Sequence, residues 1–271
     1  MHLPQTDLHV TIWGDGDPVV LVHGSLTGDP PDDDWIEQRP LATRYQLFMP
    51  SRRGYYRSPP VEQGNFEVDA DDIVQLLDSI GARAHLIAHS YGSLAALLAA
   101  SKRPEAVRSL TIIEPPAFGV ARENPAVEAL IARLEPVFAA ASRMEPEEYL
   151  LSFRRALRGV AADAPIELSQ EERKAFQSPA VRQGIEATMR ERRPWEARIP
   201  FETLAAAPFR KMVFSGNWSK AFEAVCDVFE ERLPAERAIL PGAGHAVQML
   251  GQPFNDRLVA FWESASQSSF E

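Results

Sequence analysis

Short apolar runs alternate with longer amphipathic stretches along most of the chain. Short runs that end at a Gly, Pro or polar turn are typical of buried strands. Such runs predict strands over Leu8–Trp13, Val19–Val22, Tyr45–Met49, His85–Ala88, Val107–Ile113, Lys211–Phe214 and Arg237–Leu240. Between them, apolar positions at helical spacing predict helices, among them Asp69–Ile80 and a closing helix over Phe254–Glu263. This alternation predicts an α/β fold with a mainly parallel sheet and helices on both faces.

The alternation stops over residues 119–204, where only helical patterns occur. These patterns cover Val127–Phe138, Tyr149–Leu157 and Gln170–Arg193, with a break or kink expected near Pro136 and an interruption near Pro179. An all-helical insertion between two strands is expected to cover the carboxyl ends of the strands, where ligands bind in open α/β sheets. We therefore expect a core formed by residues 1–118 and 205–271 and a helical cap formed by residues 119–204.

One serine stands between a predicted strand and a predicted helix. The apolar run His85–Ala88 leads almost directly into Ser90, and an Ala-rich helical stretch, Leu94–Ala100, follows. This order is typical of a nucleophile elbow, a sharp turn that leaves the Ser hydroxyl exposed above the sheet. Strand and helix crowd together in such a turn, and the small Ala88 and Gly92 two residues to either side meet that demand.

Composition and charge narrow the function without naming it. The chain has 271 residues, 45% hydrophobic and 24% charged, as expected of a globular protein of one large domain with an insertion. Its net charge of −10 argues against nucleic acid or anionic membranes as partners, so we expect a small-molecule substrate. We expect a monomer or a homodimer.

The sequence offers no sign of secretion, of a metal or of a cofactor. Residues 1–10 lack the pattern of a secretory signal, and the single cysteine, Cys226, fits a reducing compartment, so we expect a cytoplasmic protein. The acidic run Asp32–Asp34 has no His beside it and is interpreted as an exposed loop. We expect neither a metal nor a cofactor.

Four motifs resemble those of the α/β-hydrolase superfamily, and they follow one another along the chain in the same order as in that family. They are Val20–Ser25, Arg53–Ser58, the elbow around Ser90 and Gly242–His245, and they cover the chain outside the predicted cap. The resemblance implies a fold with a nucleophile, an acid and a histidine base in the chain order Ser, acid, His.

A serine hydroxyl needs a base within hydrogen-bond distance to act as a nucleophile. Of the six histidines, His245 lies in a Gly-rich loop after the last predicted strand, where the family order places the base. His89 precedes Ser90 and is expected to point away from the tip of the elbow. The resemblance implies a structural role for His23.

An oxyanion hole needs backbone N–H donors aimed at the charge that develops on the carbonyl oxygen. We expect one donor at Tyr91, where the helix after the elbow begins. The loop after the His-Gly turn is expected to supply the other, at Ser25.

The acid is displaced from its usual position. The family commonly places an Asp in the loop after the strand that we predict over Lys211–Phe214, but Ser219 stands there in this chain. Glu114 directly follows the strand Val107–Ile113, a position that resembles the acid of zearalenone-type lactone hydrolases. We expect Glu114 to be the acid, with Asp227 and Glu223 as alternatives.

The nucleophile type separates the chain from some relatives. Dehalogenases and epoxide hydrolases of this fold use an Asp at the elbow, whereas this chain has Ser90. We expect a serine hydrolase that cleaves a carboxylic ester or lactone of a small, largely apolar molecule through an acyl-enzyme. The alternatives are a non-hydrolytic enzyme of the same fold, perhydrolase-like or lyase-like, and a catalytically retired small-ligand binding protein.

Overall fold

Seven strands form one sheet in the order β1-β3-β2-β4-β5-β6-β7. A computed structural model describes residues 6–27, 31–161, 170, 174, 176–242 and 244–267. The strands are β1 (Val10–Trp13), β2 (Asp17–Val22), β3 (Tyr45–Pro50), β4 (Ala84–His89), β5 (Val107–Ile113), β6 (Arg210–Ser215) and β7 (Glu236–Ile239). Only β1 pairs antiparallel with its neighbour, so the expected mainly parallel sheet is confirmed.

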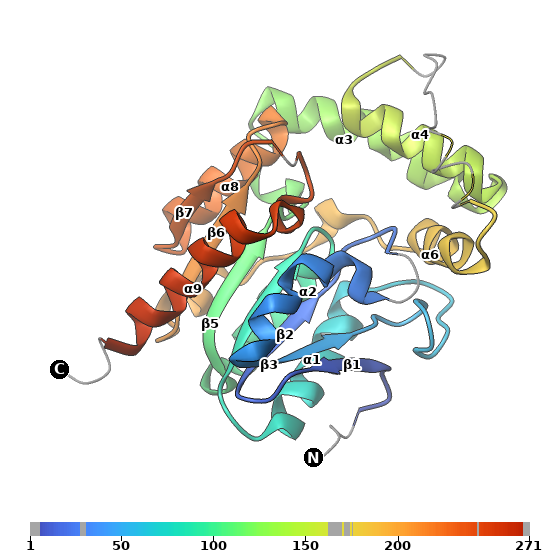
Figure 1. Cartoon of the computed structure of the whole chain (residues 1–271). Helices are drawn as coiled ribbons and strands as arrows, with labels where there is room; N and C mark the ends of the chain where they lie inside the picture. The colour runs from blue at the N-terminus through green and yellow to red at the C-terminus, as the bar shows by residue number, and fades with distance from the viewer. Residues whose placement is uncertain are drawn as a thin grey trace.

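Helices cover both faces of the sheet, as expected (Figure 1). Outside the insertion they are η1 (Pro31–Thr43), α1 (Phe66–Ile80), α2 (Gly92–Lys102), η2 (Pro104–Ala106), α8 (Lys220–Arg232), η6 (Val247–Leu250) and α9 (Gln252–Gln267). Val20 and Leu86 share a buried cluster with residues of α1, α2 and α8. Val19 and Ile87 share another with residues of α9 and η1. Successive strand residues therefore face opposite helical layers, which explains why the runs are apolar throughout.

Local sequence accounts for the ends of α1. The side chain of Asn65 accepts a hydrogen bond from the backbone N–H of Glu67, and Gly81 closes the helix with a φ of 71°. The helix therefore begins three residues before the predicted Asp69. The predicted strand ends agree with the structure to within two residues.

Between β5 and β6, the described residues form helices joined by short loops and contain no strand, apart from an isolated bridge between Gly64 and Glu191. It contains η3 (Phe118–Ala121), α3 (Pro125–Ala140), η4 (Ala141–Arg143), α4 (Pro146–Arg158), α6 (Pro179–Met189), η5 (Pro194–Glu196) and α7 (Phe201–Ala206). The helix expected to break or kink near Pro136 runs through that residue to Ala140 without a break. Most of the helix predicted before Pro179 lies outside the described residues.

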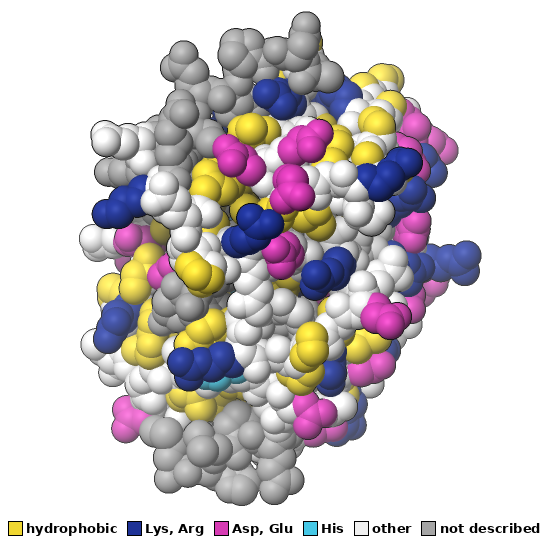
Figure 2. Space-filling model, turned by 90° about the vertical axis from the view of Figure 1, so that its right-hand side faces the viewer, with side chains coloured by type: hydrophobic (Ala, Val, Ile, Leu, Met, Phe, Trp, Pro, Cys, Tyr) yellow, Lys and Arg dark blue, Asp and Glu magenta, His cyan; other side chains and the backbone are white. Residues whose placement is uncertain are grey.

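On the face of the molecule in Figure 2, acidic and basic side chains are interspersed. In the described part of the chain, no helix has the length and apolarity needed to cross a membrane.

Candidate active site

Ser90 lies in the sharp turn between β4 and α2. Its backbone has a φ of 49°, a left-handed conformation that costs a non-glycine residue on the order of 1–3 kcal/mol. The turn admits only small neighbours, because a Cβ on Gly92 would lie 2.4 Å from the backbone oxygen of His23. A Cβ on Gly24 would lie 2.9 Å from the Cβ of Ser90. Close packing around these glycines holds the strained turn and leaves Ser90 half-buried at the end of the sheet.

Three polar side chains from distant parts of the sequence form a chain of contacts at this point. Nε2 of His245 lies 2.8 Å from Oγ of Ser90, and Nδ1 of the same ring lies 3.3 Å from Oε2 of Glu114. If Nδ1 carries its proton toward the carboxylate, Nε2 is free to accept the serine proton. The arrangement has the geometry of a nucleophile, a base and an orienting acid.

Glu114 directly follows β5 and is fully buried, with a φ of 49°. Its Oε1 accepts the backbone N–H of Gly216 at 2.6 Å, and its Oε2 accepts the indole N–H of Trp218 at 2.9 Å. These donors satisfy a carboxylate that would be costly to bury alone. Both donors come from the loop after β6, which is where the family commonly carries the acid. In this chain the loop instead binds Glu114, which follows the neighbouring strand β5.

The two alternative acids lie elsewhere on α8. Glu223 accepts hydrogen bonds from the Ser215 hydroxyl at 2.9 Å and from Arg237 at 2.5 Å. Asp227 has a side chain that is 71% exposed. Among the described contacts, neither carboxylate reaches His245.

The electrostatic surroundings favour a neutral imidazole. Desolvation lowers the pKa of His245 below its usual 6.5, while the hydrogen bond to Glu114 acts in the opposite direction. A neutral ring near pH 7 is the form that can accept a proton from Ser90.

The two residues that we predict as oxyanion donors, Ser25 and Tyr91, lie beside Ser90. Ser25 and Tyr91 both line the same cavity as Ser90, and Tyr91 directly precedes the first turn of α2. The neighbouring N–H of Leu26 is already donated to Oγ1 of Thr188 at 2.9 Å. A helix N-terminus adds favourable dipole potential for an oxyanion.

The expectation that His89 points away from the site is wrong. Its Nε2 lies 3.1 Å from the backbone oxygen of His245, and its Nδ1 lies 3.3 Å from Oδ2 of Asp34. The ring fits there because Gly24 beside it has no side chain. Asp34, expected in an exposed loop, is mostly buried and accepts the N–H of Gly24 at 3.2 Å, and interaction with His89 holds its pKa at about 2 despite burial.

A small, mainly apolar cavity opens beside Ser90. It has a volume of about 100 Å³, and its core side includes Pro116, Phe118 and Phe222. The helical insertion contributes Leu134, Phe138, Phe153, Leu157, Glu191 and Pro194. The insertion therefore supplies much of the apolar wall that faces the nucleophile.

His23 is buried and holds the adjacent loop. Its Nδ1 lies 2.8 Å from the backbone oxygen of Gly24, and its Nε2 accepts the N–H of Arg52 at 2.9 Å. Burial, with the nearby Arg52 charge, lowers its pKa to about 3, so the ring is neutral.

Trp218, Asp34 and Glu191 are contacts of the site that the sequence analysis did not identify. Trp218 lies in the loop after β6. The only local signal in that loop is that Ser219 stands where the family commonly has its acid. Asp34 and Glu191 stand in charged runs that look solvated, and nothing local indicates their buried partners. Among the described residues, no group of three or more His, Cys, Asp or Glu side chains is arranged to hold a metal ion.

A family model and several known proteins are similar to this chain. The model of the alpha/beta hydrolase family matches residues 19–258. A non-heme chloroperoxidase, CPO-A1 of Kitasatospora aureofaciens, is 39% identical over 85 residues, which is 30% of this chain and 30% of that protein. The chain spans less than half the length of the curated relatives it matches, between 30% and 42%.

Solved structures extend the similarity over the whole fold. A carboxylesterase of the Thaumarchaeon Nitrososphaera gargenis superimposes with a TM-score of 0.71 at 18% identity, covering 96% of both chains. Est816, an N-acyl homoserine lactone degrading enzyme, superimposes with a TM-score of 0.64 at 21% identity, covering 94% of this chain and 96% of its own. With the family match over most of its length, the chain belongs to the alpha/beta hydrolase family.

Proposed function

We propose that this protein is a serine hydrolase that cleaves a carboxylic ester or lactone of a small, largely apolar molecule through an acyl-enzyme. The observation that carries the proposal is the chain of contacts from Ser90 through His245 to Glu114 beside an apolar cavity. The carboxylesterase and the lactone-degrading enzyme among the structural neighbours support this class of substrate.

In the proposed reaction, Nε2 of His245 takes the hydroxyl proton of Ser90 as Oγ attacks the carbonyl carbon. The N–H groups of Ser25 and Tyr91 stabilise the oxyanion of the tetrahedral intermediate. His245 then gives the proton to the departing alkoxide, leaving an ester on Ser90. Water, deprotonated by the same histidine, hydrolyses this ester. Glu114 orients the ring and stabilises its protonated form.

The helical insertion acts as a cap that selects the substrate. Six of its residues line the cavity, and five of these are apolar. The cavity volume of about 100 Å³ is smaller than the roughly 150 Å³ of an engineered apolar cavity that binds benzene, so a compact acyl group fits better than a long chain.

Hydrolysis of short p-nitrophenyl esters and of small lactones tests the proposal. Ser90→Ala is expected to lose at least about a thousandfold in kcat. Ser79→Ala is the matched control, because its hydroxyl bonds the backbone oxygen of Leu76 on α1, away from the cavity. If the wild-type protein cleaves none of these substrates, the proposal fails and a binding protein is favoured.

A second candidate activity is favoured by the chloroperoxidase relative. In a perhydrolase-like reaction, hydrogen peroxide replaces water in attacking the acyl-enzyme, releasing a peracid and free Ser90. Peracid formation with acetate ester and peroxide, measured against the rate of plain hydrolysis, distinguishes the two activities.

A further inference from the structure

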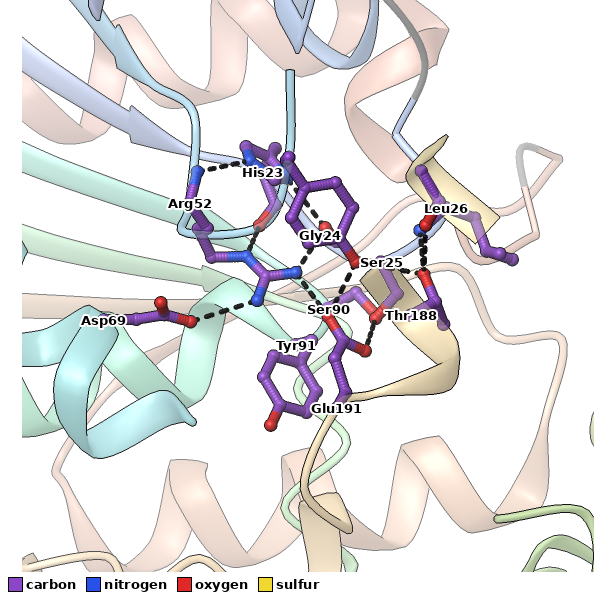
Figure 3. A network of polar contacts seen from close by, with 12 residues as sticks. His23, Gly24, Ser25, Leu26, Arg52, Asp69, Ser90, Tyr91, Thr188 and Glu191 are labelled. Carbon is purple, nitrogen blue, oxygen red and sulfur yellow. Dashed lines mark hydrogen bonds and ion pairs between the residues drawn. The ribbon is translucent and has the colours of Figure 1, made fainter. Parts of the chain in front are cut away.

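One short segment of the helical insertion, Thr188–Arg192, is hydrogen-bonded to both residues that we propose as oxyanion donors. The hydroxyl of Ser25 donates to Oε2 of Glu191 at 2.5 Å. The hydroxyl of Tyr91 donates to the backbone oxygen of Arg192 at 3.0 Å. The N–H of Leu26, next to Ser25, donates to Oγ1 of Thr188 (Figure 3). The end of α6 and the residues after it therefore contact the elbow and the loop that faces it.

Glu191 is the charged centre of these contacts. It is 5% exposed, and its Oε1 accepts Arg52 at 2.6 Å and the hydroxyl of Tyr55 at 2.8 Å. With Ser25 bonded to Oε2, both oxygens are occupied by protein donors. Although Glu191 lines the cavity, its carboxylate is therefore set to act through its partners rather than on a substrate.

Arg52 extends this link to the peptide that carries the N–H of Ser25. Its guanidinium donates to the backbone oxygens of Gly24 at 2.8 Å and of His23 at 3.2 Å. In a planar trans peptide, the oxygen of Gly24 and the N–H of Ser25 point in opposite directions. Fixing the oxygen at Arg52 therefore fixes the direction of the N–H.

Arg52 is itself held tightly. It pairs with Asp69 at 3.1 Å as well as with Glu191, and its guanidinium carbon lies 4.7 Å and 4.8 Å from the rings of Tyr55 and Tyr91. A buried cation of this kind depends on its carboxylate partners. Removing the charge of Glu191 is thus expected to disturb Arg52 and, through it, the loop.

Backbone hydrogen bonds attach the insertion to the core where Glu191 lies. The N–H of Arg192 donates to the oxygen of Gly64 at 2.8 Å, and the N–H of Gly64 donates to the oxygen of Arg190 at 3.0 Å. On α6, a Cβ on Gly184 would lie 2.2 Å from the backbone oxygen of Thr27, so helix and loop are in backbone contact. The backbone on both sides of Glu191 is therefore held against the core.

We propose that Glu191 is a positioning residue for the oxyanion hole, orienting the N–H of Ser25 through the Ser25 hydroxyl and Arg52. Cap and oxyanion hole then form one unit, so that cap residues control the rate of the chemical step as well as the shape of the pocket. This inference rests on the proposed function.

Glu191→Gln tests the inference, with Glu196→Gln as the matched control. A glutamine amide can keep its oxygen toward Arg52 and its NH₂ group toward the Ser25 hydroxyl, but it carries no charge to pair with Arg52, and the Ser25 hydroxyl must then accept instead of donate. Glu196 lies on the same insertion but pairs with Arg192 at the surface, at 3.0 Å. We expect Glu191→Gln to lower kcat about 10- to 100-fold with KM changed less than about threefold, since one oxyanion donor is worth about 100- to 1,000-fold. Glu196→Gln should match the wild-type protein.

Binding of a transition-state analogue separates positioning from a general structural effect. Affinity for a trifluoromethyl ketone that forms a tetrahedral adduct should fall in parallel with kcat/KM, while affinity for the carboxylate product stays within about threefold. Unchanged ketone affinity, or equal losses for ketone and product, overturns the inference. If Glu191→Gln does not fold, Tyr55→Phe removes one hydrogen bond to Glu191 and should give the same pattern at about three- to tenfold. Absence of any esterase activity in the wild-type protein would instead refute the proposed function.

Discussion

Trp218 donates its indole N–H to Glu114 over 2.9 Å, joining the loop after β6 to the carboxylate that directly follows β5. The same carboxylate oxygen faces Nδ1 of His245 at 3.3 Å. The indole therefore fixes the oxygen that orients the histidine. The loop after β6, where Ser219 stands in place of a carboxylate, supplies two donors that satisfy the buried Glu114, which we propose as the acid.

Trp218→Phe should weaken this arrangement without abolishing it. Hydrogen bonds to charged groups contribute about 1.5–3 kcal/mol, and the free energy of unfolding should fall by about that amount in urea titrations. We expect kcat to fall about three- to tenfold, because Gly216 still holds the other oxygen. A kcat loss as large as that of Glu114→Gln would mean that the indole acts directly on the substrate.

Glu114→Gln should lower kcat at least about a hundredfold, as expected for loss of a triad acid. It should also move the acid limb of kcat/KM to lower pH. The hydrogen bond to Glu114 raises the pKa of His245, so its loss lets desolvation lower that pKa further. A pH–rate profile between pH 4 and pH 8, a range chosen to bracket the usual histidine pKa of about 6.5, measures both effects.

Asp227→Asn is the matched control for this prediction, because that carboxylate is exposed on α8. It should retain activity close to that of the wild-type protein. Near-normal turnover by Glu114→Gln together with a large loss in Asp227→Asn would reassign the acid.

Gly24→Ala tests the crowding around the elbow. The new Cβ would lie 2.9 Å from the Cβ of Ser90 and 3.1 Å from Nδ1 of His89, both in a packed site. Overpacking typically costs about 1–3 kcal/mol, and displacement of Ser90 should lower kcat at least about tenfold. Thermal unfolding and steady-state kinetics measure the two effects.

Gly81→Ala provides the comparison. Its φ of 71° strains a side chain, but within 4 Å a Cβ there meets no atom of the described structure. We expect a loss of about 1 kcal/mol in stability and unchanged kinetics. Equal kinetics in both variants would show that the elbow tolerates a larger residue at position 24.

His85→Gln should make the protein less sensitive to acid. His85 is buried, lies 2.7 Å from the Ser109 hydroxyl and stacks on Trp262, and burial lowers its pKa to about 3. In the unfolded chain, His85 becomes protonated below about pH 6.5, whereas in the folded protein it stays neutral down to about pH 3. The free energy of unfolding therefore falls as the pH drops from about 6.5 toward 3.

From pH 7 to pH 5, His85 should account for a loss of about 2 kcal/mol in the free energy of unfolding. That part of the loss should be missing in His85→Gln, while the part due to His23 remains. Urea titrations at the two pH values measure the difference. An identical loss in both proteins would mean that His85 is protonated in the folded state.

Much of the fold could be predicted from the sequence because the strands are buried on both faces and read as continuous apolar runs. β5 carries Leu110 and Ile112 on one face and Ile113 on the other, and its predicted bounds match the structure. The same run led to Glu114, since a carboxylate that directly follows a buried strand needs partners.

Contacts between distant segments could not be predicted in this way. The ring of His89 turns toward His245 because Gly24, far away in sequence, leaves space beside it. Glu191 belongs to a run of four charged residues, Arg190–Arg193, and such a run predicts an exposed segment. Its side chain is nevertheless buried, where it pairs with Arg52. Charge patterns predict a solvated surface unless the buried partner is known, and only the tertiary structure identifies that partner.

The central claim is that Ser90 is the nucleophile, activated by His245. Labelling with a fluorophosphonate probe, followed by peptide mass spectrometry, tests it most directly. The account predicts a single covalent adduct on Ser90 at neutral pH, no adduct in Ser90→Ala, and slow labelling in His245→Gln. An adduct on another residue, or rapid labelling of His245→Gln, would contradict it.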